Sequence, residues 1–236
     1  MIEIEDLTKN FGKLTAVNHV NLKIFDNECF ALLGLNGAGK TTLLNILSTQ
    51  ITPSSGSAKI DGLDLLNDRD KIRKIINISP QESAVAKNLT VRENLELIAD
   101  LYNIENKAEN VDNLINELGL REKEKVLCKK LSGGQMRRLS IALAIITSPK
   151  ILFLDEPTLG LDVKARKTLW DIVKTLKKKM TIILTTHYLE EVEFLADRIA
   201  IISRGKIKTC GTLDEILSQT NCKNLEQAFL SLTEEE

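Results

Sequence analysis

The chain has 236 residues, of which 43% are hydrophobic and 28% are charged, the composition of a globular protein with a sizeable core. Acidic and basic residues almost cancel, at 33 against 32, so the net charge gives no support to non-specific nucleic-acid binding. The four cysteines are scattered without a C-x-x-C spacing, which indicates reduced thiols and neither a disulfide framework nor a zinc site. The N-terminus lacks a signal-peptide pattern, and no apolar run approaches the roughly 20 residues that cross a bilayer.

Apolar and polar side chains alternate in the first 30 residues. Ile2 and Ile4 alternate with acidic residues, and Val20, Leu22 and Ile24 alternate with polar ones. Because a strand points successive side chains to opposite faces, this pattern predicts half-buried antiparallel strands.

A phosphate-binding pattern follows. Residues 34–41 read GLNGAGKT and fit G-x-x-x-x-G-K-[ST] at every fixed position. The apolar run at residues 29–33 predicts a buried strand before them, and residues 42–47 predict a helix after them. Glycines let backbone N–H groups turn inward, and the helix start adds partial positive charge. An ordinary glycine-rich turn is the alternative, but it gives no reason for the Lys-Thr pair.

This loop predicts a nucleotide site. We expect Lys40 to reach the β- and γ-phosphates and the Thr41 hydroxyl to ligate Mg²⁺. Phe11, in the turn at residues 10–13, either stacks on the base or covers the sheet, and the sequence leaves both open. The other residues expected to contact nucleotide from this loop are Asn36, Gly37, Ala38, Gly39 and Thr42.

Residues 75–79 predict the next strand, which Pro80 stops. Gln81 follows directly, at a strand end, where α/β sheets usually bind ligands. A surface glutamine is the alternative reading of this position.

The pattern then turns helical. Thr90 and Glu93 fit a capping box. Two sets of apolar residues at helical spacing predict amphipathic helices, and they are Leu95, Ile98, Ala99 and Tyr102, then Val111, Leu114, Ile115 and Leu118. We therefore expect one domain spanning 1–236, in which residues 1–82 and 149–236 form a β subdomain and core and residues 83–148 form a helical subdomain.

Residues 131–135 read LSGGQ within that insert. Ser132 and Gln135 fit a second capping box, opening a helix at residues 136–147. A capping box leaves the adjacent Gly133 and Gly134 unexplained, because each is disfavoured by about 1 kcal/mol in a helix. Close approach of another backbone or a phosphate would explain them, so the stretch predicts a second anion-binding helix start.

An acid pair ends the next buried strand, residues 151–154. An unneutralised pair there is costly unless a cation or a reaction uses it. Asp155 fits the Mg²⁺ ligand, and Glu156 would orient or deprotonate the water that attacks the γ-phosphate.

A turn ending at Asp162 precedes a predicted helix at residues 163–178 and a buried strand at residues 181–185. His187 lies just beyond that strand, as Gln81 and Asp155 lie beyond theirs, so we expect it at the γ-phosphate.

A last strand at residues 199–202, a turn and two short helices from Leu213 complete the chain, and the acidic end, Glu234 to Glu236, is expected to be frayed.

These motifs resemble, over essentially the whole chain, those of the nucleotide-binding ATPase subunits of ABC transporters. Residues 34–41 resemble the Walker A motif, and residues 131–135 the LSGGQ signature. Asp155 and Glu156 resemble the Walker B aspartate and the catalytic glutamate. The resemblance implies a P-loop NTPase (RecA-like) α/β core with an N-terminal antiparallel β subdomain and an inserted α-helical subdomain.

Four further positions match the family one by one. Gln81 is similar to the Q-loop glutamine and a further Mg²⁺ ligand, Asp162 to the D-loop aspartate, and His187 to the switch histidine. Phe11 resembles the base-stacking aromatic, where tyrosine is more usual.

The resemblance implies an ATPase that binds ATP and Mg²⁺. It implies a head-to-tail dimer, with itself or a related subunit, in which Ser132, Gly133, Gly134 and Gln135 of one chain close over the ATP of the other. The partner would be a membrane-spanning transporter subunit, with no nucleic acid involved. Since the chain shows no span of its own, it would lie on the cytoplasmic face of the membrane.

Residues 186–191, 169–171 and 224–230 resemble the ATPases of ABC-2 drug and antibiotic exporters. They imply export of a drug, antibiotic, peptide or lipid-like substrate. One alternative is a soluble ABC-type ATPase switch without transport, and another is a non-hydrolysing nucleotide sensor. The absence of a coiled-coil insert or a second cassette is evidence against the switch, and the intact acid pair with His187 is evidence against the sensor.

Overall fold

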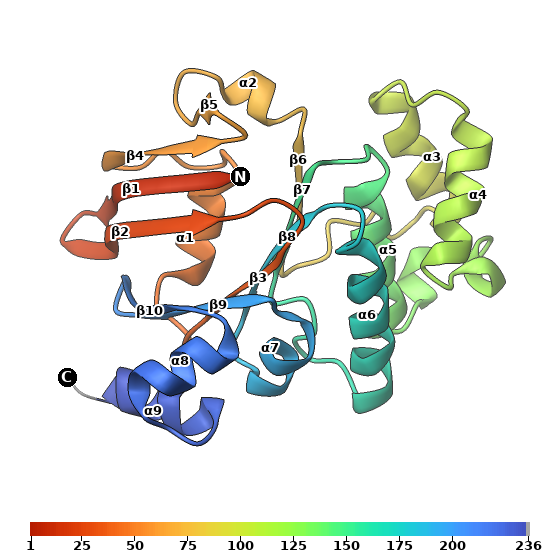
Figure 1. Ribbon diagram of the computed structural model, residues 1–236. Coiled ribbons are helices and arrows are strands. Elements are labelled where there is room, and N and C mark those ends of the chain that lie inside the picture. The colour runs from red at the N-terminus through yellow and green to blue at the C-terminus, as the bar shows by residue number, and fades with distance from the viewer. Residues whose placement is uncertain (235–236) are drawn as a thin grey trace.

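The computed structural model describes residues 1–234, which form two sheets and a helical arm (Figure 1). The strands are β1 (Ile2–Phe11), β2 (Leu14–Ile24), β3 (Cys29–Leu33), β4 (Ser55–Ile60), β5 (Leu63–Asp64), β6 (Ile76–Ser79), β7 (Ile151–Asp155), β8 (Thr181–Thr186), β9 (Arg198–Ser203) and β10 (Lys206–Gly211). The α-helices are α1 (Lys40–Leu47), α2 (Arg69–Ile72), α3 (Val91–Leu101), α4 (Lys107–Glu117), α5 (Gly133–Ile145), α6 (Val163–Leu176), α7 (Leu189–Leu195), α8 (Leu213–Thr220) and α9 (Leu225–Glu234), and two 3₁₀ turns are η1 (Arg121–Lys123) and η2 (Cys128–Lys130).

The antiparallel sheet has the order β2-β1-β4-β5. The predicted alternation is confirmed, since Ile2, Ile4, Val20, Leu22 and Ile24 are all buried. β1 extends through Phe11, which pairs with Leu14, so this ring lies at a strand end and not in the turn.

The larger sheet has the order β10-β9-β3-β8-β7-β6, with five parallel strands from β9 to β6. β3, β7 and β8 are buried along their whole length, because elements cover both faces of a parallel sheet. Their carboxyl ends meet at one edge, and the loops leaving that edge carry most of the predicted site residues.

Two apolar clusters hold these layers together. On one face, α1 lies between the two sheets and contacts β2, β7 and β8, and the apolar cluster there includes Leu43, Leu44 and Phe30. On the other face, α5, α6, α7 and α9 pack on the parallel sheet through residues such as Leu139 and Leu169. The expected α/β core with an N-terminal antiparallel sheet is therefore confirmed.

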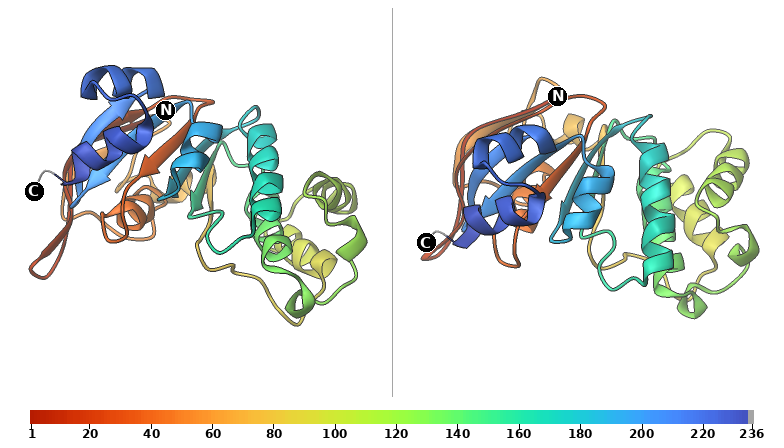
Figure 2. Two further views of the ribbon diagram at one scale, coloured as in Figure 1. Left: turned by 90° about the horizontal axis from the view of Figure 1, so that it is seen from below. Right: turned by 60° about the horizontal axis from the view of Figure 1, so that its bottom comes forward.

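The helical arm extends from the sheets (Figure 2). The capping box of Thr90 and Glu93 is confirmed, and Arg92 bonds Asp112 and Glu124, joining α3 to α4 and to the segment after η1. α5 packs against α3 and also against β6 and α6, so it joins the arm to the core. The division at residues 83 and 148 stays a prediction.

Three local expectations were wrong. Tyr102, expected on the apolar face of α3, is 59% exposed, because α3 ends at Leu101 and Tyr102 is only its C-cap. β10 was not predicted; the positive φ of Arg204 and Gly205 closes a hairpin from β9. The helix opened by LSGGQ begins at Gly133 and ends at Ile145.

The expectation for Glu235 and Glu236 lies outside the described residues. Among the helices of residues 1–234, none has the length and apolarity to cross a bilayer.

Candidate functional site

A cavity of about 740 Å³ lies where the parallel strands end beside the β1–β2 hairpin. The predicted residues that line it are Phe11, Asn36, Gly37, Ala38, Gly39, Lys40, Thr41, Thr42, Gln81, Glu156 and His187. Phe11 comes from the end of β1, and the others come from the segments that follow β3, β6, β7 and β8, far apart in sequence. The fold thus brings together most of the site that the sequence predicted.

The phosphate loop leads into an open helix start. Gly39 has φ +105°, and a Cβ there would come 2.3 Å from the Ala16 carbonyl oxygen, so only glycine fits. None of the described side chains caps α1, whereas α3, α5 and α8 all begin with a capping box. The first N–H groups of α1 are therefore oriented to bind an anion.

Lys40 is 5% exposed, and its ammonium lies inside the loop. Nζ donates to the Gly34 carbonyl at 2.8 Å and pairs with Glu156 Oε1 at 3.1 Å. The ammonium of Lys40 therefore lies in the cavity, where it balances the buried carboxylate of Glu156.

Asp155 lies beneath the cavity floor and is 4% exposed. Its Oδ1 accepts from Thr41 Oγ1 at 3.1 Å and from Thr185 Oγ1 at 2.5 Å. Sequence reasoning missed Thr185, for which the one signal was a hydroxyl at the end of an apolar strand.

These oxygens fit Mg²⁺. A hydroxyl and a carboxylate face each other, and Gln81 lines the same cavity. Within residues 1–234 no three acidic, histidine or cysteine side chains form a metal cluster. Mg²⁺ suits such a site, because it usually takes one or two protein oxygens and completes its shell with phosphate and water.

Glu156 has a left-handed backbone, with φ +44°. Its N–H donates to the Thr185 carbonyl at 3.1 Å and to Thr185 Oγ1 at 3.0 Å, and Oε2 lies 2.9 Å from His187 Nδ1. Backbone strain in a residue other than glycine is often found at functional sites. Here the strained turn directs the carboxylate, 6% exposed, toward both Lys40 and His187.

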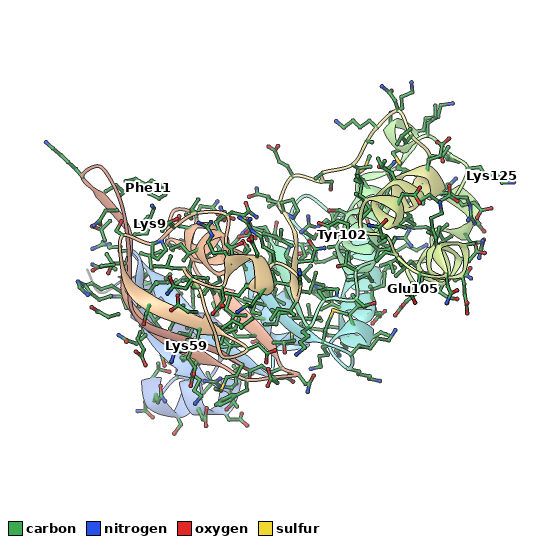
Figure 3. All side chains as sticks on the ribbon, turned by 90° about the horizontal axis from the view of Figure 1, so that it is seen from above. Lys9, Phe11, Lys59, Tyr102, Glu105 and Lys125 are labelled. Carbon is green, nitrogen blue, oxygen red and sulfur yellow. The ribbon has the colours of Figure 1, made fainter. Side chains whose placement is uncertain are left out.

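Phe11 lies by the β1–β2 hairpin near Lys9, far from the helical arm (Figure 3). The ring is 50% exposed and lines the cavity. Lys9 Nζ lies 5.1 Å from the ring centroid, so one face of the ring already contacts a cation.

The LSGGQ segment lies outside this cavity. The capping box is confirmed, since the Ser132 N–H donates to Gln135 Oε1 at 3.0 Å. A Cβ on Gly134 would meet Ala165 Cβ at 2.8 Å, so packing of α5 on α6 explains this glycine. A Cβ on Gly133 would come no closer than 3.7 Å to Leu161, so packing within the chain does not explain that one.

Asp162 also lies outside the cavity and caps α6, because its Oδ1 accepts from the Ala165 N–H at 2.8 Å. Its neighbour Leu161 lies beside Gly133. The structure therefore places Asp162 near the LSGGQ segment and outside the cavity that the Lys40 loop, residues 34–41, lines.

Comparison with known proteins supports this picture. The family model described as "ABC transporter" matches residues 17–159. The rat protein "ATP-binding cassette sub-family A member 2" is 40% identical over 89% of this chain, and the human "Phospholipid-transporting ATPase ABCA3" is 39% identical over 89%. The matched region is only 9% and 13% of those two proteins, so the chain spans about a tenth of the length of these relatives.

A solved structure gives the same fold. It is described as a dimeric post-hydrolysis state of the ATP-binding cassette MJ0796 bound to ADP and Pi. That protein is 28% identical to this chain, with a TM-score of 0.80 over 90% of this chain and 99% of the other. The expected P-loop core is thereby confirmed, and the chain belongs to the ABC transporter family as one of its ATP-binding cassette ATPase domains.

Proposed function

We propose that two such cassettes, identical or related, meet head to tail around ATP and that hydrolysis then drives export through a membrane-spanning subunit. The observation that supports this proposal is the separation of two helix starts, the uncapped start of α1 and the start of α5 in the LSGGQ segment. The Lys40 loop opens into the cavity, whereas Ser132 and Gly133 are exposed elsewhere. One chain thus holds two parts of a site that a second copy would complete.

The chemistry follows from the residues in the cavity. The start of α1 and Lys40 bind the triphosphate. Thr41, Asp155 and Gln81 would hold Mg²⁺, which would neutralise charge on the phosphate oxygens. Lys40 leaves Glu156 for the phosphate. Glu156 then polarises the attacking water, and His187, bonded to it, contacts the γ-phosphate.

The membrane subunit would dock over a second cavity, of about 490 Å³, at the junction of core and arm. Its lining includes residues of β6 and of the segments that follow α1 and α3. Tyr102, which lies at that junction in Figure 3, is among them. β6 leads to Gln81 in the nucleotide cavity, so a partner docked on β6 would be connected to the bound nucleotide through this strand. The chain would then lie on the cytoplasmic face of the membrane.

Mixing two inactive variants tests the shared site. Lys40→Ala removes the phosphate lysine, and Ser132→Arg blocks the LSGGQ helix start. Each variant alone should be inactive. A mixed dimer keeps one intact site, so an equal mixture should recover ATPase activity, up to roughly a quarter of wild type if the sites act independently. Steady-state phosphate release measures it.

A second mixture is the control for this experiment. Lys40→Ala mixed with Asp155→Ala should stay inactive, because both changes fall in the same half of the site. No recovery in the first mixture, with dimers present by light scattering, would contradict the shared site.

A separate assay tests the transported substrate. The name of the relative ABCA3 suggests a lipid-like substrate. Vesicles that contain the full transporter are therefore tested for transport of a fluorescent phospholipid and, for comparison, of a fluorescent drug.

His187→Ala is expected to slow hydrolysis more than it weakens ATP binding. The imidazole contacts Glu156, and the Lys40 loop that binds phosphate stays unchanged. We expect kcat to fall by about 10²-fold or more, with the Kd for MgATP changed by only a few-fold. Isothermal titration and single-turnover rates separate the two effects, and equal losses in both would contradict the assigned role.

A further inference from the structure

Arg137 is a charged side chain in the second turn of α5, and it is only 5% exposed. Its Nε donates to the Pro157 carbonyl at 2.9 Å and its Nη2 to the Asp155 carbonyl at 2.8 Å. Its Nη1 donates to the Pro80 carbonyl. One guanidinium therefore joins three main-chain carbonyls from two separate parts of the sequence.

Each of these carbonyls adjoins a predicted site residue. Pro80 precedes Gln81, and Pro157 follows Glu156. Arg137 itself lies two residues after Gln135, at the base of the LSGGQ helix start. The Arg137 side chain thus connects the exposed end of α5 to the main chain that carries Gln81, Asp155 and Glu156.

The contact requires an arginine. The guanidinium presents its N–H groups in a rigid planar fork, which can satisfy three carbonyls at once, whereas a lysine is a single point donor. Burial lowers the pKa of Arg137 to about 10, opposed by the negative charges of Asp155 and Glu191. The side chain stays charged at neutral pH, so its bonds to carbonyls are charge-assisted and persist.

We propose that Arg137 is a positioning residue that couples the LSGGQ end of α5 to Gln81, Asp155 and Glu156 of the same chain. Contact of Ser132 with the partner's nucleotide would shift α5, and Arg137 would carry that shift into its own chain's site. The proposal rests on the proposed function, because it assigns α5 a ligand in the partner. Small displacements matter here, since about 1 Å of misplacement can cost 10²-fold in rate.

The neighbouring Arg138 provides a matched control. It lies on the same helix and is also partly buried, and its Nη1 donates to two carbonyls, Leu118 and Gly119, both at 2.9 Å. Those acceptors belong to the helical arm alone. Arg137→Met and Arg138→Met therefore remove similar groups, but only the first removes the attachment to the site.

The experiment measures kcat at saturating ATP, the KM and Kd for MgATP, and the thermal midpoint for both variants in the full chain. We expect Arg137→Met to lower kcat by about 10- to 100-fold with KM and Kd within about threefold of wild type. Arg137→Lys should give an intermediate kcat, because one carbonyl keeps a charged donor. Arg138→Met should keep kcat per folded protein, whatever its thermal midpoint. Equal kcat in the Arg137 and Arg138 variants would overturn the proposal.

A second measurement needs no turnover. Hydrogen exchange of the nucleotide-free protein should be faster in peptides covering residues 80–83 and 155–159 of Arg137→Met, and unchanged in those of Arg138→Met. Unchanged hydrogen exchange in Arg137→Met would by itself contradict the proposal that Arg137 attaches α5 to these two segments. If the two variants show these exchange results but the wild-type protein does not hydrolyse ATP, the proposed function would be contradicted instead.

Discussion

Glu156→Gln is expected to reduce ATP hydrolysis by about 10²- to 10⁴-fold and to tighten ATP binding. Glutamine keeps the size of the side chain and can still bond His187, but it cannot accept a proton from water. It also has no charge to hold Lys40, which now pairs with Glu156 at 3.1 Å. Lys40 then no longer has to leave an ion pair to reach the phosphate, so the Kd for MgATP should fall.

Phosphate release and isothermal titration measure the two effects. Glu28→Gln is the matched control, because Glu28 is also a buried carboxyl, 8% exposed and paired with Arg198 at 3.2 Å. It precedes β3, at the sheet edge opposite the cavity. The control variant should hydrolyse ATP at the wild-type rate. A Glu156→Gln variant that keeps its activity would remove Glu156 from the proposed chemistry.

The Glu156→Gln variant also tests whether two chains form a dimer around ATP. With hydrolysis blocked, MgATP should remain bound between two chains, and light scattering should show a dimer that ADP does not support. Ser132→Arg in the same background should remain monomeric, because the second helix start is blocked. A Glu156→Gln variant that is monomeric with MgATP would count against the head-to-tail arrangement.

Motifs with fixed spacing predicted the cavity well. The Lys40 loop, Glu156 and His187 each follow a buried strand, and Asp155 ends one. Because parallel strands end at one edge of the sheet, the convergence of these residues followed from the sequence. The LSGGQ segment was also identified correctly as a capped helix start. The sequence could not show that Gly134 contacts Ala165, because that contact depends on how α5 and α6 pack.

Side chains that act through tertiary contacts were missed for the same reason. Thr185 holds Asp155 and the Glu156 backbone from a neighbouring strand, and Arg137 reaches carbonyls 18 to 57 residues away. Their positions in the pattern resemble ordinary strand and helix residues. Tyr102 shows the converse case, because its helical spacing matched an apolar face although α3 ends one residue earlier.

Lys40→Met is expected to affect both ATP binding and the stability of the nucleotide-free protein. It removes a charged partner of the phosphates, which should weaken MgATP binding by about 10- to 100-fold. It also leaves Glu156 buried without its cation. Breaking a buried pair by removing one partner costs about 3 kcal/mol or more, equivalent to a thermal midpoint lower by roughly 6–12 °C in a domain of this size.

A double-mutant cycle separates these two effects. Lys40→Met with Glu156→Gln removes both charges, so the nucleotide-free double variant should regain most of the lost thermal stability while its ATP affinity stays low. Scanning calorimetry without nucleotide measures the first quantity, and titration with MgATP measures the second. If the two changes were additive in stability, the ion pair would not link the residues in the free protein. The expected increase in ATP affinity for Glu156→Gln would then have no physical basis, because that increase depends on releasing Lys40 from the pair.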